Sequence, residues 1–198
     1  MSISLFDATV GCYLQTIPSI LGCLDRARDH CLRENIDPEI LVERSIHDDM
    51  FPLHFQIITL VHFSEGALAA AGSERLGGPD MTLAFTFDEL QGYLRASMER
   101  LAKIDPAGIN ALVGGEVVFQ YGDVTLPFTT EDFFRTYATP NFYFHATTVY
   151  AILRAFGVPI GIANYIGAVK TTRSCQFPAQ VKQYTGEEYL TFLKTLVG

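Results

Sequence analysis

The sequence has few charges, no tryptophan and no long apolar run, and each absence narrows its class. Charged residues make up 18% of the 198 residues and hydrophobic residues 48%, which is typical of a globular domain rather than of a disordered chain. Two uncharged stretches, residues 55–64 and 137–153, are interrupted by polar residues and are too short for a membrane-spanning helix. We therefore expect no membrane partner.

Basic runs, cysteine pairs and a secretion signal are also missing. The net charge is −8 and Lys and Arg are not clustered, which argues against nucleic acid and anionic lipid as partners. Residues 1–9, MSISLFDAT, contain no basic n-region, so a cytoplasmic protein is expected. The four cysteines form no C-x-x-C pair and are expected to be free thiols, buried or half-buried; they are Cys12, Cys23, Cys31 and Cys175.

Apolar residues recur at steps of three and four, which predicts four amphipathic helices. Asp48 or Asp49 is expected to cap the second helix, and Thr86 with Glu89 forms a capping box at the start of the third. Pro140 is expected to break the fourth helix in its middle. The four segments are residues 5–33, 48–72, 86–104 and 129–157.

A hairpin and a tail complete the predicted chain. Two β-prone runs flank the turn at residues 122–123, between Gly114 and Thr129, and this pattern predicts a β-hairpin. After Gly167 the periodicity fades until residues 187–197, which predict a last short helix. We expect a mainly α fold, a four-helix up-and-down bundle in residues 1–168 with the hairpin before its last helix. Residues 169–198 form a C-terminal extension.

The usual catalytic motifs are absent, so candidate chemistry rests on histidines and their neighbours. Asn141 and His145 are four apart and share one face of the fourth helix, while His62 lies among apolar residues deep in the second. Buried polar groups without partners cost a few kcal/mol. Asn141 and His145 therefore either hydrogen-bond to each other and to Gln56, or line a wet pocket that holds a ligand or an ion. A satisfied core histidine is an equally good interpretation of His62.

Two segments resemble domain of unknown function family 1993. They are residues 49–56, DMFPLHFQ, and residues 140–154, PNFYFHATTVYAILR. The similarity also includes the start of the first helix, the hairpin and residues 157–159, and it covers residues 1–168. That family is similar to a branch of the DinB/YfiT-like helical-bundle superfamily. The resemblance therefore implies a DinB-like four-helix bundle.

The superfamily resemblance also implies a metal site. Its members are similar in placing three histidines around a divalent metal, one on helix two and an H-x-x-x-H pair on helix four. By this resemblance His62 falls at or near the first position, Asn141 replaces the second and His145 takes the third. Two imidazoles and a carboxamide oxygen are a weaker set for zinc or nickel than three imidazoles. Zinc or nickel at His62 and His145 is the cofactor that the resemblance implies.

Two functions fit these residues. The first is a small-molecule enzyme in which His62 and His145 are general acid and base, or hold a metal that polarises a substrate oxygen. The resemblance implies isomerase, lyase or transferase chemistry, as in maleylpyruvate isomerase-like and thiol S-transferase-like relatives. The candidate site residues are His145, His62, Tyr143 and Tyr150 for catalysis and Gln56 and Asn141 for substrate binding.

The second function is a non-catalytic, dimeric helical-bundle binding protein. In it the His, Asn and Gln side chains form only a structural hydrogen-bond network that fixes how the helices align. Fifteen Phe and nine Tyr supply aromatic surface for a ligand pocket or for a dimer face. We expect a small-molecule ligand and a homodimer.

Overall fold

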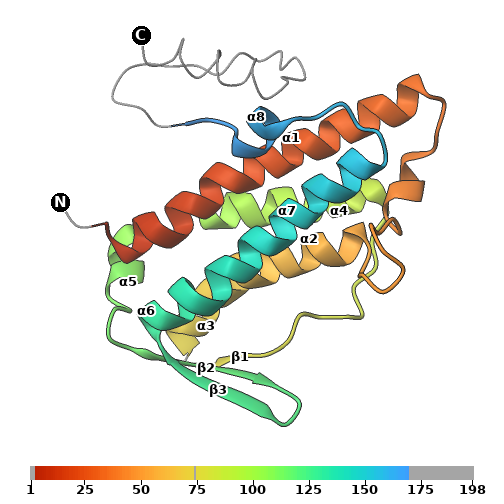
Figure 1. Ribbon diagram of the computed structural model, residues 1–198. Helices are drawn as coiled ribbons and strands as arrows, with labels where there is room; N and C mark the ends of the chain where they lie inside the picture. Colours follow the sequence, from red (N-terminus) through yellow and green to blue (C-terminus); the bar gives the residue numbers. More distant parts are fainter. Residues whose placement is uncertain (1–2, 74, 170–198) are drawn as a thin grey trace.

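The computed structural model describes residues 3–73 and 75–169, and four long helices dominate it (Figure 1). The first helix consists of a π-helical segment, η1 (Asp7–Gly11), and α1 (Cys12–Arg33). The second consists of α2 (Leu53–Val61), the π-helical segment η3 (His62–Gly66) and α3 (Ala67–Ser73). The third is α4 (Phe87–Leu101). The fourth consists of α6 (Thr130–Asp132), the π-helical segment η4 (Phe133–Ala138) and α7 (Thr139–Ala155).

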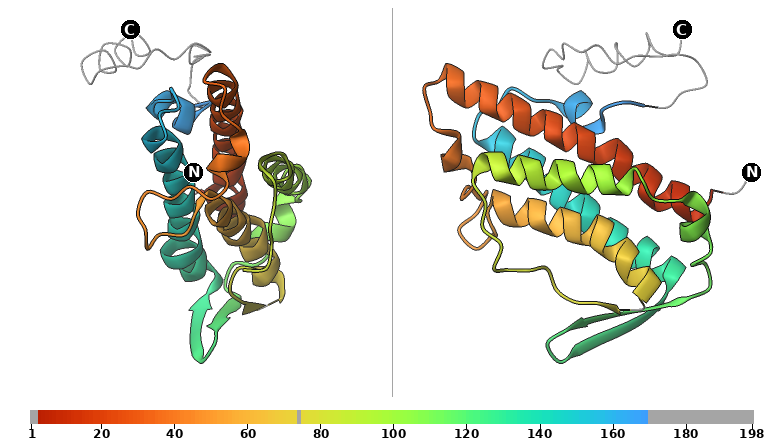
Figure 2. Two further views of the ribbon diagram at one scale, coloured as in Figure 1. Left: turned by 90° about the vertical axis from the view of Figure 1, so that its right-hand side faces the viewer. Right: turned by 180° about the vertical axis from the view of Figure 1, so that it is seen from behind.

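The four helices form a bundle, as the sequence predicts. Both α1 and α2 pack against α4 and against α7, so that α1 lies diagonally opposite α2 (Figure 2). Helices α1 and α7 run in one direction and α2 and α4 in the other, because the connection over residues 77–86 returns along the bundle before α4 begins (Figures 1 and 2). The helix order is therefore up, down, down, up, with one long crossover, and it differs in this connection from the alternating up-and-down order that the sequence analysis expects. The largest fully buried side chains include Tyr13, Phe87, Phe133 and Phe142.

A small sheet closes one end of the bundle (Figure 1). The predicted hairpin is confirmed as β2 (Glu116–Tyr121) and β3 (Val124–Thr129), which pair antiparallel. A third strand, β1 (Arg75–Leu76), pairs parallel with β2. Two residues are too few to show alternation of apolar and polar side chains, and this strand was not predicted.

The helix starts show which caps are local and which are not. The capping box of Thr86 and Glu89 is confirmed at the start of α4. The predicted start of the second helix at Asp48 or Asp49 is wrong, because α2 begins at Leu53. Its first N–H groups donate to carbonyls of the preceding loop, Leu53 N to the oxygen of Arg44 at 2.8 Å among them. With these donors satisfied by backbone, no carboxylate cap is required.

Pro140 does not break the fourth helix, contrary to the prediction. It lies in the first turn of α7, directly after the π-helical segment η4. A π-helical turn is wider than an α-helical one and so accommodates a residue that lacks an N–H and crowds the preceding carbonyls. Gly157 ends the helix as expected, with a φ of +103° that favours glycine.

The remaining elements are short. They are the 3₁₀ turn η2 (Pro38–Leu41), α5 (Pro106–Asn110) and α8 (Ile162–Ile166), which packs on α1. Cys12 is half-buried and Cys23 and Cys31 are buried, all as free thiols, whereas Cys175 and the predicted helix over residues 187–197 lie outside the described residues. Within residues 3–73 and 75–169, no helix combines the length and the apolar character needed to cross a membrane.

Candidate active site

His145 and Gln56 meet where α7 packs against α2. His145 Nδ1 lies 2.7 Å from Gln56 Oε1, and Gln56 Nε2 donates to the backbone oxygen of Phe51 at 2.7 Å. The second bond fixes the amide orientation, because a flipped amide would place its oxygen against the Phe51 oxygen. Gln56 Oε1 is therefore the acceptor and His145 Nδ1 carries the proton. The lone pair of the neutral imidazole is consequently on Nε2.

Aromatic rings surround the His145 imidazole. The ring of Phe63 is stacked parallel to it with centroids 6.2 Å apart, and the rings of Phe55 and Phe144 approach it edge-on. Phe51, stacked near Phe55, is 54% exposed and Phe144 is 57% exposed. His145 itself is only 9% exposed. The imidazole thus lies just beneath a surface made of aromatic side chains.

Burial controls the protonation of His145. Loss of hydration lowers the pKa of its imidazole to about 4, and repulsion from the positive charge of a protonated His62 acts in the same direction. At neutral pH the His145 ring is therefore uncharged. Its Nε2 can then accept a hydrogen bond or a proton, while its one N–H, at Nδ1, is donated to Gln56.

His62 points into a different space. It lines a cavity of about 310 Å³ between the second helix, α4 and the crossover, together with Glu65, Tyr93, Asp80 and Arg100. Glu65 and Arg100 form a two-bond ion pair across this cavity, with N···O distances of 2.5 and 2.9 Å. The sequence prediction lets His62 and His145 share one site, but His62 lines the cavity beside α4 whereas His145 extends from α7 to Gln56. The two rings are still close enough for a charge on His62 to lower the pKa of His145.

The buried part of the His62 ring is poorly satisfied. Its Nε2 is buried and makes no well-formed hydrogen bond within the described part of the chain. Burial lowers the pKa of His62, and a hydrogen bond with the Gly77 backbone opposes this shift. Burial has the larger effect, so the net shift is downward. His62 is uncharged at neutral pH for the same reason as His145.

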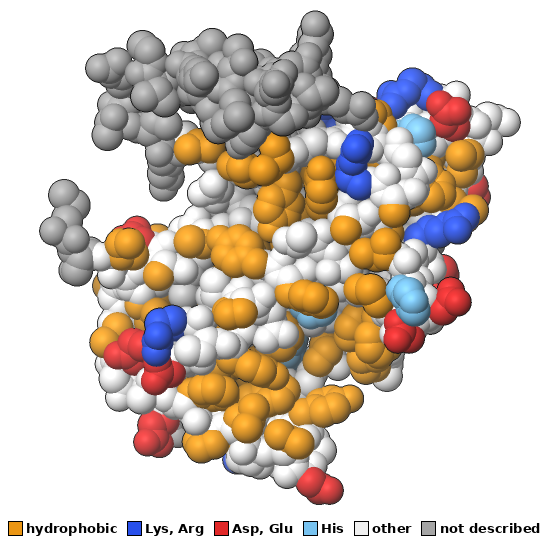
Figure 3. Space-filling view, viewed as in Figure 1, with side chains coloured by type: hydrophobic (Ala, Val, Ile, Leu, Met, Phe, Trp, Pro, Cys, Tyr) orange, Lys and Arg blue, Asp and Glu red, His pale blue; other side chains and the backbone are white. Residues whose placement is uncertain are grey.

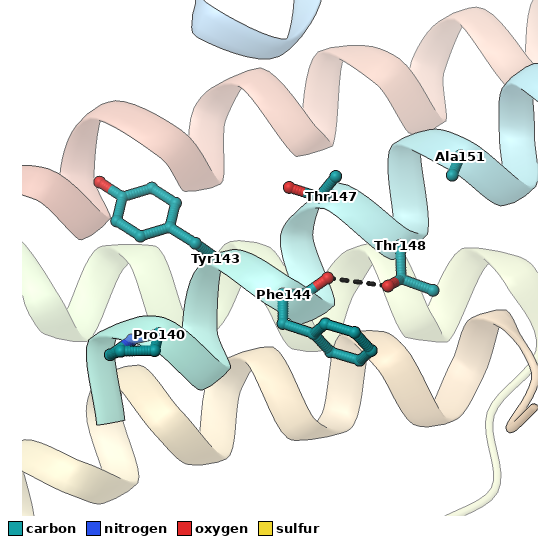
Figure 4. Close-up of a pocket in the computed structure, with 6 residues that line it drawn as sticks. All are labelled: Pro140, Tyr143, Phe144, Thr147, Thr148 and Ala151. Carbon is teal, nitrogen blue, oxygen red and sulfur yellow. Dashed lines mark hydrogen bonds between the residues drawn. The ribbon is translucent and has the colours of Figure 1, made fainter. Parts of the chain in front are cut away.

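The other predicted site residues lie apart from the His145–Gln56 pair. The Asn141 amide donates to the carbonyl of Tyr137, one turn back on its own helix, at 2.7 Å. Tyr143 extends toward α1 and borders a groove along α7 (Figure 4), and burial raises its pKa to about 12. Tyr150 packs edge-on against Tyr165, with centroids 5.8 Å apart. Of the predicted set, only Gln56 is bonded to His145.

Sequence reasoning missed the groups that complete both sites. The carbonyl of Phe51 leaves no sequence signal, because every residue has one. The ion pair of Glu65 with Arg100 joins residues 35 apart, and no local pattern indicates it. The separation of His62 from Gln56 did have a signal: six residues turn a helix by about 600°, which leaves the two side chains about 120° apart around the axis.

Comparison with known proteins identifies the family. Residues 5–166 match the family described as Domain of unknown function (DUF1993). The chain belongs to this family. The predicted resemblance is therefore confirmed for the DUF1993 chain, whose family description gives no activity.

The DUF1993 chain also has a known fold. It is similar to the crystal structure of a DinB family member protein from Shewanella denitrificans, with a TM-score of 0.72 and 23% sequence identity. The match covers 85% of this chain and 95% of that one. No curated protein matches the sequence. At this level of identity the likeness shows a DinB-like fold and nothing about activity.

The described residues of the DUF1993 chain do not fit a three-ligand metal site. In residues 3–73 and 75–169, no three His, Cys, Asp or Glu side chains lie close enough to hold one ion. His62 faces the cavity beside α4, and Asn141 is bonded to its own helix. His145 Nε2 remains as a single ligand atom, which is too few to hold a divalent ion.

Proposed function

We propose that this chain is a small-molecule enzyme in which His145 accepts a proton from the substrate. The observation that supports this role is the chain of two 2.7 Å hydrogen bonds from the Phe51 carbonyl through Gln56 to His145 Nδ1. It holds one tautomer and one ring orientation, which is the arrangement that a general base requires. Gln56 would then be a positioning residue rather than the substrate-binding residue that the sequence suggested.

The low pKa of His145 defines the half-reaction that it can perform. With a pKa of about 4 it is in the basic form at neutral pH, so it can accept a proton but cannot begin the cycle as an acid. Its substrate must present an acidic C–H, an O–H or an S–H. Isomerase, lyase and transferase reactions that begin with proton removal all fit this requirement.

The surroundings of His145 indicate the substrate class. The rings of Phe55, Phe63 and Phe144 lie around the imidazole, whereas the carboxylates of Glu65 and Asp80 line the separate cavity at His62. An apolar enclosure favours a compact, mostly apolar molecule over a highly charged one. We propose such a molecule, with a single hydrogen-bond donor directed at Nε2.

The test is conversion of a metabolite extract by the full chain, followed by mass spectrometry. We expect wild type to deplete at least one compound, and His145→Ala to reduce that rate by about a hundredfold or more. His145→Gln keeps an N–H for Gln56 but lacks the base, and it should lose activity while staying folded. His54→Ala is the matched control, because His54 lies in the first turn of α2 and its ring contacts the loop carbonyl of Val42 and the carboxylate of Glu43. Unchanged conversion by His145→Gln would contradict the proposal.

The buried state of the network favours one alternative, a non-catalytic binding protein. Gln56 is 2% exposed, and its bond to His145 ties α2 to α7 in one alignment. A protein of this kind would retain a compound from the extract without changing its mass. Retention without conversion, measured by native mass spectrometry, distinguishes the alternative from the enzyme.

A further inference from the structure

The outer surface of α7 forms a shallow groove of about 390 Å³ (Figure 4). Its floor consists of small side chains, among them Thr147 and Ala151. Tyr143 stands on the side of α1 and Phe144 on the side of α2. A groove with a floor of small residues allows a second helix to approach closely.

The residues of this groove follow the spacing of a helix-packing face. Pro140, Phe144, Thr147 and Ala151 are separated by four, three and four positions, which places them in one stripe along the helix. The opposite stripe, which includes Phe142, is already buried between α1 and α2. Helix α7 therefore carries two packing faces, and the bundle uses one of them.

The outer face is apolar and uncharged. Residues 139–153 include no Asp, Glu, Lys or Arg, although the chain as a whole has a net charge of −8. Figure 3 shows hydrophobic and uncharged side chains across the middle of this face, and charged ones toward its edges among the residues described. Phe144, at the centre of α7, is 57% exposed. A large exposed ring beside a groove marks a contact surface.

We propose that this face is a two-fold interface with a second copy of the chain, in which the two α7 helices pack antiparallel. A ridge, Phe144, and a groove lie side by side on one helix, so a two-fold axis places the ridge of each copy in the groove of the other. Two copies that each carry a net charge of −8 repel one another, and the repulsion is weakest where neither presents a charge. The uncharged stripe of α7 meets that condition.

The size of the face limits the affinity. The 17 residues of α7 give a contact about 26 Å long. Stable interfaces bury roughly 800 Å² per partner, so α7 needs help from neighbouring exposed side chains such as Phe51 beside it. We expect a dimer with a dissociation constant of about 1 μM.

The test is the mass of the full chain in solution, by analytical ultracentrifugation over a concentration series. Wild type is expected at twice its 21.9 kDa chain mass above about 10 μM. Ala151→Glu places a carboxylate in the floor of each groove, where it would be buried without a partner, and should raise the dissociation constant about a hundredfold or more. Thr147→Glu, at an exposed position, serves as a second variant if Ala151→Glu fails to fold.

The matched control is Ala96→Glu. Ala96 is half-buried like Ala151 but lies on α4, which is diagonally opposite α7. It adds the same charge and should leave the dimer intact. The proposal is overturned by a wild-type monomer at all concentrations, by dimers of folded Ala151→Glu or Thr147→Glu, or by dissociation of Ala96→Glu. It does not depend on His145, because mass is measured and no ligand is needed.

Discussion

Toward α7, the second helix presents Gln56, whose amide is bonded at both ends, and toward α4 it presents His62, whose buried Nε2 has no well-formed bond within the described chain. The first region is closed, with a histidine held in one tautomer. The second contains a cavity of about 310 Å³ and an ion pair at its edge. One helix thus borders a histidine whose Nδ1 has a partner on one side and a histidine whose buried Nε2 lacks a well-formed bond on the other.

The difference between His145 and His62 separates the effect of burial on an imidazole from the effect of a hydrogen-bond partner. Both imidazoles have a lowered pKa because both are removed from water. For His145, the Gln56 oxygen decides which nitrogen carries the proton. A buried, fully bonded polar pair restricts the structure to one arrangement, whereas a buried nitrogen without a good partner costs about 1–3 kcal/mol.

Of the changes that test this comparison, acidification should change the free energy of unfolding most. The pKa of His145 is about 4 in the folded chain and 6.5 ordinarily, so between these values the unfolded chain binds more protons. Its contribution to stability is complete above pH 6.5 and is lost as the pH falls toward 4. We expect a loss of about 3 kcal/mol from this group, measured as the free energy of unfolding in urea at each pH.

The control for acidification is His145→Gln, which keeps a donor for Gln56 but does not titrate. Lowered pKa values at other groups, His62 included, remain in this variant. The slope of stability against pH between 4 and 6.5 should therefore be smaller than in wild type. Equal slopes in the two proteins would show that His145 is not held neutral by the fold.

Loss of the Gln56 amide should have the next largest effect on the free energy of unfolding. Gln56→Leu keeps the volume of the side chain but leaves the His145 Nδ1 proton and the Phe51 carbonyl without their partner. We expect a cost of about 2 kcal/mol in urea unfolding at pH 7. Gln15→Leu is the control, because Gln15 is exposed and its amide donates a long bond of 3.5 Å to the Ile166 carbonyl, and it should cost less than about 0.5 kcal/mol. Similar costs for the two variants would contradict the role of the Gln56 bonds.

The parts of the fold that sequence predicted are those with a local cause. The four helices follow from apolar spacing, and the start of α4 follows from Thr86 and Glu89, which bond to each other's backbone. The start of α2 depended instead on the carbonyl of Arg44, nine residues earlier, and Pro140 on a preceding π-helical segment. Neither condition can be recognised from spacing.

In the candidate site, too, some features could be predicted from local sequence and others could not. One of the two predicted arrangements was a network of Asn141, His145 and Gln56. The His145–Gln56 bond is present, whereas the Asn141 amide bonds to Tyr137 instead. The tautomer was not predictable, because it depends on the backbone oxygen of Phe51. The different direction of His62 was predictable in principle from its six-residue separation from Gln56, since helical rotation places the two side chains about 120° apart.

Removal of the unsatisfied imidazole should have the smallest effect, with the opposite sign. His62→Leu replaces a ring whose buried Nε2 lacks a well-formed bond by an apolar side chain that fits beside Ile58 and Val61 in the cavity wall. We expect the free energy of unfolding at pH 7 to rise by about 0.5 to 1 kcal/mol, because the desolvation cost of the nitrogen disappears. The same change at His145 would remove a bonded partner and should destabilise the fold. A loss of more than about 1 kcal/mol in His62→Leu would mean that Nε2 is satisfied in solution, and the contrast between the two sides of α2 would then be wrong.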